Sequence, residues 1–173
     1  MIPEIGHVAL ILALTMALAQ SVLPLVGAQQ GNAAWMSLAR PSARGQFIFM
    51  LIAYGCLTYA FVNNDFSVLL AAEHSNSSLP LMYRLTAVWG NHEGSILLWS
   101  LILSGWTFAV SIFSKRLDDV TVARVLGVMG LVSCGFMLFT LFTSNPFERL
   151  LPAAPDGRDL NPLLQDPGMV IHP

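Results

Sequence analysis

Four long stretches of the chain contain no Asp, Glu, Lys or Arg, and they constrain the fold more than any other feature. They cover residues 5–26, 46–62, 95–113 and 125–142 and are 17 to 22 residues long. Helices of this length span about 25–33 Å, close to the roughly 30 Å hydrocarbon core of a bilayer. Only 10% of all residues are charged, against about 25% in soluble proteins. The sequence therefore predicts an all-α membrane protein with four transmembrane helices.

The distribution of Lys and Arg predicts how these helices are oriented. Five of the eight basic residues fall in the connections at 27–45 and 114–124, and three fall in the loop at 63–94 or the tail at 143–173. Cytoplasmic connections carry the excess of positive charge, so we expect the loop and the tail in the periplasm of a bacterial inner membrane. The first helix, within residues 1–26, has no basic residue before it and exceeds a signal-peptide core in length, which predicts an uncleaved anchor with its amino terminus outside.

The two expected outer segments carry apolar residues of their own. In the loop, Leu81, Leu85 and Trp89 follow Pro80 at helical spacing, which predicts a short interfacial helix. The tail has six prolines among residues 145–173, which exclude a continuous helix. Its apolar pairs nevertheless indicate that it packs against another part of the protein.

Two of the predicted helices present a face of small or hydroxyl side chains. Such faces let helices approach closely in lipid, so we interpret them first as packing surfaces. They consist of Ser100, Ser104, Thr107 and Ser111 in the third helix and of Gly127, Gly130 and Cys134 in the fourth.

The composition and the motif content exclude several classes of function. The net charge is −2, so there is no basic excess to hold a nucleic-acid backbone, and we expect no nucleic-acid partner. Cys56 and Cys134 lie inside apolar stretches without CxxC spacing, which argues against a disulfide scaffold or a zinc site. The sequence contains no CxxCH, Walker A, HExxH or GxSxG motif.

The four histidines are candidates for metal ligands or proton carriers, because imidazole binds metals and titrates near neutral pH. His7, in the first turns of the first helix, is expected to be an interfacial or interhelix hydrogen-bonding residue. His74, within a polar run, is expected to be a solvated loop residue. His172 precedes Pro173, which favours an extended backbone.

The remaining histidine, His92, lies in the most unusual segment of the chain. Residues 89–95 read WGNHEGS and stand at the outer start of the third helix. Capping by Asn91, Glu93 or Ser95 would explain part of this composition. A ligand or substrate contact by His92 and Trp89 is the alternative, and both interpretations stay open at this point.

Four stretches of the sequence resemble the CcmF family of cytochrome c-type biogenesis proteins, which includes the NrfE proteins. They read PEIG at 3–6, WGNHEGS at 89–95, FTSNPF at 142–147 and RDLNPLLQDPGMVIHP at 158–173. The resemblance extends from end to end, and the last stretch is the most specific. It implies a polytopic inner-membrane protein, a component of a haem lyase, that acts late in the maturation of c-type cytochromes.

The resemblance also implies cofactors and partners. Family members are expected to accept haem from the haem chaperone CcmE and to attach it to the CxxCH motif of apocytochrome c, which thioredoxin-like proteins such as CcmH present. They also hold a b-type haem in the helical bundle. By the same resemblance, His172 is expected to be an axial ligand of the incoming haem iron at the outer face. His92 and Trp89 remain candidates for a haem contact.

The chain departs from the family in length. Members have several hundred residues, with a tryptophan-rich outer segment and further functional histidines beyond the part matched here. We therefore expect this chain to be the N-terminal portion, as a fragment, a truncated product or one piece of a split protein. On this reading its partners are lipid and the rest of the CcmF polypeptide, and we expect no haem attachment by this chain alone. Two other classes remain open, a non-catalytic assembly subunit and an ion-translocating subunit.

Overall fold

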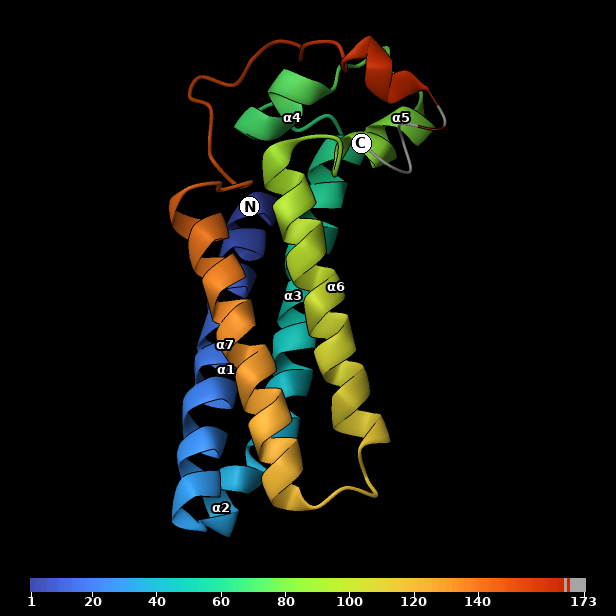
Figure 1. The fold of residues 1–173 in the computed structure, drawn as a ribbon. Helices are drawn as coiled ribbons and strands as arrows, with labels where there is room; N and C mark the ends of the chain where they lie inside the picture. The colour runs from blue at the N-terminus through green and yellow to red at the C-terminus, as the bar shows by residue number, and fades with distance from the viewer. Residues whose placement is uncertain (167, 169–173) are drawn as a thin grey trace.

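The computed structural model describes residues 1–166 and 168, which fold as a helical bundle with a cap at one end (Figure 1). Four long helices form the bundle: α1 (Ile2–Gln30), α3 (Ala39–Val62), α6 (His92–Phe113) and α7 (Asp119–Phe142). Short helices lie at both ends of it: α2 (Ala33–Ser37) far from the cap, and α4 (Leu69–His74), α5 (Leu81–Ala87) and the 3₁₀ turn η1 (Pro162–Gln165) within the cap. The predicted all-α fold with four helices of membrane-spanning length is confirmed.

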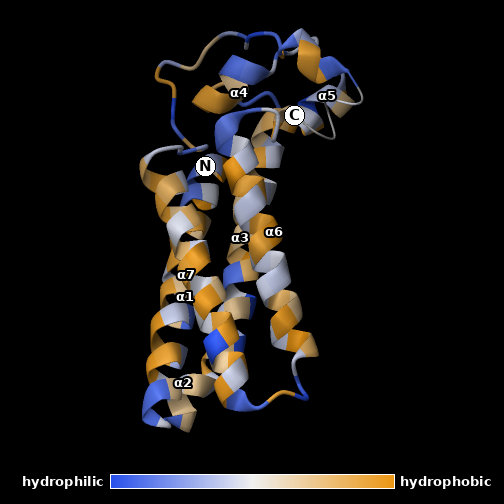
Figure 2. Cartoon of the chain, viewed as in Figure 1, coloured by the Kyte–Doolittle hydropathy of each residue, from blue (hydrophilic) through white to orange (hydrophobic). Residues whose placement is uncertain are grey.

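The four long helices are apolar along most of their length, while hydrophilic residues gather in the cap and at the connections (Figure 2). All four long helices begin earlier than the apolar stretches suggested: α1 at Ile2, α3 at Ala39, α6 at His92 and α7 at Asp119. The start of α3 is stabilised by Arg40, whose Nη1 donates hydrogen bonds to the Ser111 carbonyl oxygen (2.9 Å) and to Ser114 Oγ (2.8 Å). This guanidinium therefore donates hydrogen bonds at the end of α6, where the last carbonyl groups lack partners within the helix. Its positive charge also interacts favourably with the helix dipole there.

The small and hydroxyl faces predicted from the sequence are packing surfaces in the structure. Ser100, Ser104, Thr107 and Ser111 are each 1% exposed or less. Their hydroxyl groups donate to carbonyl groups of α6 itself, which satisfies them inside the bundle. On α7, a Cβ added at Gly130 would lie 3.1 Å from the Ala17 carbonyl oxygen, because α1 and α7 approach closely there. Both packing predictions are confirmed.

The cap is built from the loop between α3 and α6 together with the tail that follows α7 (Figure 1). The tail runs beside the loop at an isolated β-bridge between Val68 and Arg149 and at a hydrogen bond from the Arg158 amide to the Ala72 carbonyl oxygen (2.7 Å). Leu160 of the tail is buried. The prediction that the tail packs on another part of the protein is thus confirmed for its described residues. The expected short helix after Pro80 is also present, as α5.

Candidate functional site

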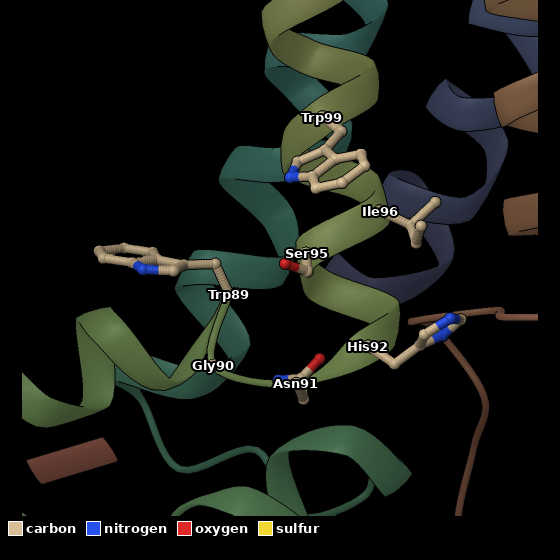
Figure 3. Close-up of a pocket in the computed structure, with 7 residues that line it drawn as sticks. All are labelled: Trp89, Gly90, Asn91, His92, Ser95, Ile96 and Trp99. Atoms are coloured by element: carbon tan, nitrogen blue, oxygen red, sulfur yellow. The ribbon is translucent and has the colours of Figure 1, made fainter. Parts of the chain in front are cut away.

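The WGNHEGS segment forms a tight corner between α5 and the first turn of α6 (Figure 3). Asn91 caps α6: its Oδ1 accepts the Gly94 amide (2.7 Å), and its Nδ2 donates to the Ala87 carbonyl oxygen (2.8 Å). A Cβ added at Gly94 would overlap the Val88 carbonyl oxygen, so only glycine fits there. The capping interpretation is therefore confirmed for Asn91. It accounts for the Asn and one Gly of the segment, but not for Trp89 or His92.

The same corner contains an open hollow of about 320 Å³. Both Trp89 and His92 line it, but Figure 3 shows their rings pointing in opposite directions, Trp89 from the connection before α6 and His92 from the first turn of α6. The two side chains are therefore not arranged to bind one small ligand between them. They are parts of a broader surface, which Trp99 continues along α6. The full lining is Trp89, Gly90, Asn91, His92, Ser95, Ile96 and Trp99.

His92 connects the start of α6 to the end of α7. Its Nδ1 lies 3.1 Å from Ser144 Oγ, and its ring meets Phe139 edge to face with the centroids 5.9 Å apart. When Nδ1 carries the proton and donates to Ser144, Nε2 keeps its lone pair. Nε2 makes no hydrogen bond with the described residues, and the side chain is exposed. This is the arrangement in which an imidazole, oriented through one nitrogen, can bind a metal or a ligand through the other.

The other histidines are less suited to bind a ligand. His7 is half-buried and packs edge to face against Phe147, in the turn that follows α7 (6.3 Å between centroids). It makes no hydrogen bond with the described residues, so the expected interhelix hydrogen bond is not seen. His74 is not a solvated loop residue: it ends α4 and is half-buried, with Nδ1 3.1 Å from the Leu70 carbonyl oxygen. His172, the expected axial ligand, lies outside the described residues. Within residues 1–166 and 168, no three His, Cys, Asp or Glu side chains cluster as a metal site.

A chain of pairwise contacts joins the four sequence stretches at 3–6, 89–95, 142–147 and 158–173. A Cβ at Gly6, in the first stretch, would overlap the Phe147 ring of the third. The third stretch also supplies Ser144, the hydrogen-bonding neighbour of His92 in the second. The fourth reaches the second through Leu164, whose Cδ1 would lie 3.1 Å from a Cβ at Gly90. Segments that are far apart in the sequence therefore meet at one end of the bundle.

The sequence alone did not identify Ser144 and Phe139 as neighbours of His92. Ser144 stands in the FTSNPF stretch, whose sequence gives no indication of its partner. Phe139 looks like any other apolar residue of a membrane helix. Only the antiparallel pairing of α6 and α7 places both beside the imidazole.

Comparisons with known proteins agree on one family. The sequence model of the family described as Cytochrome C assembly protein matches residues 89–173. Cytochrome c-type biogenesis protein CcmF from Pseudomonas aeruginosa is 66% identical over 174 residues, a match that covers 100% of this chain and 26% of the relative. The relative of the same name from Escherichia coli is 56% identical and covered to 27%. The chain thus spans about a quarter of the length of these relatives.

A solved structure supports the same assignment at the level of the fold. The protein titled Cytochrome c Heme Lyase CcmF superposes with a TM-score of 0.79 at 28% sequence identity, and the match covers 88% of this chain and 26% of that one. The similarity in sequence extends over the whole chain, and the similarity in fold extends over most of it. The chain therefore belongs to the CcmF family of cytochrome c-type biogenesis proteins and corresponds to the amino-terminal part of its members.

Proposed function

We propose that this chain forms the amino-terminal part of a haem-handling protein of cytochrome c maturation. The single observation that carries the proposal is the meeting of the four stretches at one end of the bundle, where a chain of contacts links them to the His92 corner. Stretches that serve only their own helices need not converge, whereas residues that build one site must. The corner is proposed to face the periplasm of a bacterial inner membrane, in agreement with the distribution of Lys and Arg.

The complete activity is proposed for the whole family polypeptide, of which this chain spans about a quarter. In that polypeptide, haem would arrive from the chaperone CcmE. It would be joined to the CxxCH thiols of apocytochrome c presented by a thioredoxin-like protein of the CcmH type. The contribution of this chain would be to hold and orient haem at the corner.

The donor groups at the corner suit one side of such a haem surface. His92 offers an exposed imidazole whose Nε2 makes no hydrogen bond with the described residues, and Trp89 and Trp99 offer indole rings along the same hollow. Imidazole is a common ligand of haem iron, and aromatic rings pack against a porphyrin. The residues fit a contact surface, but His92 is the only imidazole among those lining the hollow.

The axial ligand itself is proposed to be His172, as the resemblance implies. The fourth stretch begins at Arg158, and its described part packs into the cap and against the corner through Leu160 and Leu164. This placement supports a position of the stretch near the outer surface. His92 is proposed as a neighbouring contact, oriented by Ser144.

The b-type haem of the family does not fit the described part of this bundle. Of the four histidines, only His7 and His92 lie on the long helices, and both stand near the helix ends that lie beneath the cap. The middle of the bundle therefore supplies no pair of imidazoles. We assign no b-type haem ligand to this chain.

The proposal is tested in a full-length chimera, in which these 173 residues replace the corresponding part of the Pseudomonas aeruginosa relative. His172→Ala should leave the membrane level of the protein unchanged, alter its haem absorption spectrum and abolish haem staining of a CxxCH reporter cytochrome. His92→Ala should weaken haem retention without abolishing maturation. The matched control is His74→Ala, because His74 contacts α4 rather than the corner.

Two results would contradict the proposal. If His172→Ala gave normal haem staining of the reporter and an unchanged absorption spectrum, His172 would not be an axial ligand of the haem iron. If His92→Ala lowered only the thermal stability and left the spectrum unchanged, the corner would be an assembly element and not a haem contact.

A further inference from the structure

A groove between α6 and α7 continues from the corner toward the middle of the bundle. Two hollows of about 320 and 430 Å³ lie along it, and they share lining residues with each other and with the hollow at the corner. We call this surface the α6–α7 groove. Its principal residues are Ile96, Trp99, Trp106, Val132, Gly135 and Phe136.

Two tryptophans in this groove lie at an unusual depth. Trp99 and Trp106 are each seven residues from an end of α6, which places both about 5 Å from the middle of a helix about 33 Å long. Tryptophan in membrane proteins is enriched at the interfaces with water, not near the bilayer centre. Trp99 is 59% exposed and Trp106 is 65% exposed. Because they are seven residues apart, both lie on the same face of α6.

The indole groups of these tryptophans need hydrogen-bond acceptors. Neither indole N–H makes a hydrogen bond with the described residues. In hydrocarbon there is no water to accept it, and an acyl chain offers no oxygen at that depth. An unsatisfied donor in such surroundings costs free energy, so a neighbour that brings acceptors to both levels of α6 is favoured.

On the α7 side of the groove, the surface around Gly135 is open enough for another helix to approach. A Cβ added at Gly135 would meet no atom within 4 Å, so the surface of α7 is open there. Val132 and Phe136 flank it. A glycine on an open face of a membrane helix allows the backbone of another helix to approach closely, which an acyl chain does not require.

We propose that the α6–α7 groove is the docking site for a further membrane-spanning helix, supplied by the part of the CcmF-family polypeptide beyond this quarter. The relatives are about four times as long as the matched region, so in those relatives such a partner is available within the same molecule. Its chemistry follows from the groove: an apolar face against Phe136, with acceptor oxygens from hydroxyl or free carbonyl groups opposite Trp99 and Trp106. This contact does not depend on haem at His92.

The test uses the full-length chimera with a photoreactive benzoylphenylalanine at Phe136. After irradiation in membranes, mass spectrometry should identify crosslinked peptides from an apolar segment downstream of residue 173. Gly135→Leu should reduce this crosslink several-fold, because the added side chain fills the space of the incoming backbone. Gly55→Leu is the matched control, since Gly55 is also an exposed glycine in a long helix with no atom near its Cβ position, but lies on α3 outside the groove.

The parent chimera decides the question even where Gly135→Leu fails to fold. Adducts only of lipid, or of a bound haem or quinone, would overturn the proposal. An undiminished crosslink in a folded Gly135→Leu protein would overturn it as well.

Discussion

Replacing Gly94 with Ala should destabilise the chain, although alanine is the better helix former. The added Cβ would overlap the Val88 carbonyl oxygen and would lie 3.0 Å from Asn91 Oδ1, so the turn before α6 must move. Overpacking of this kind costs about 1–3 kcal/mol. Disturbing the Asn91 cap costs about 1 kcal/mol more. Alanine recovers about 1 kcal/mol in helix propensity. The expected net loss is about 1–3 kcal/mol.

The two cysteines of the chain provide a direct assay for this loss. Cys134 is buried and Cys56 is half-buried, and neither forms a disulfide, so a thiol-reactive fluorophore reports when the bundle opens on heating in detergent. The Gly94→Ala midpoint should fall by a few degrees. Gly55→Ala is the control: open space surrounds that position, so the same exchange should leave the midpoint unchanged or raise it.

The opposite result would refute the steric argument. If Gly94→Ala unfolds at or above the wild-type temperature, the corner tolerates a Cβ. In that case Gly94 would not be explained by close packing of the turn against α6.

Three further predictions concern the orientation and the ends of the bundle. A cysteine placed at Ser77 should be labelled from outside intact cells, whereas one at the exposed Ser37 should not; the reverse pattern would invert the orientation. The Ser77 hydroxyl and amide groups hold the pKa of Asp156 below its usual value. Because the pKa of Asp156 is lower in the folded state, this contact stabilises the tail above about pH 4. The stabilisation is lost as the pH falls through the folded-state pKa. Acid should therefore speed proteolysis of the tail in the wild type more than in Asp156→Asn. Arg40→Met should lower the thermal midpoint by the equivalent of about 2 kcal/mol, because it removes charged hydrogen bonds to Ser114; an unchanged midpoint would show that these bonds contribute nothing measurable.

Much of the local structure follows directly from short stretches of sequence. The Asn91 cap is formed within three residues, and α7 begins in the same way at Asp118, whose Oδ2 accepts the Thr121 amide (2.8 Å). The hydroxyl face from Ser100 to Ser111 was recognised from its spacing because one helix carries all of it. Such features need no knowledge of which helices become neighbours.

The exact ends of the helices are harder to predict from the sequence. The start of α3 at Ala39 could not be read from hydropathy, because Arg40 makes that stretch look like a connection. The arginine is accommodated only because the end of α6 presents carbonyl groups to it, 71 residues further along the chain. The prediction for His74 is wrong for a related reason: the polar run around it indicates a loop, although its ring contacts a carbonyl group of its own helix.

By itself the sequence determined that this chain enters a membrane as four helices, because hydrophobicity and length are properties of each segment alone. Only the tertiary structure decided which residues share a site. The imidazole of His92 and the hydroxyl of Ser144 are 52 residues apart, and they meet because α6 and α7 pair in opposite directions. In the same way, Gly6 meets Phe147 because the start of α1 and the end of α7 both lie beneath the cap. Contacts between distant segments depend on how helices pack, and that packing is a property of the whole bundle.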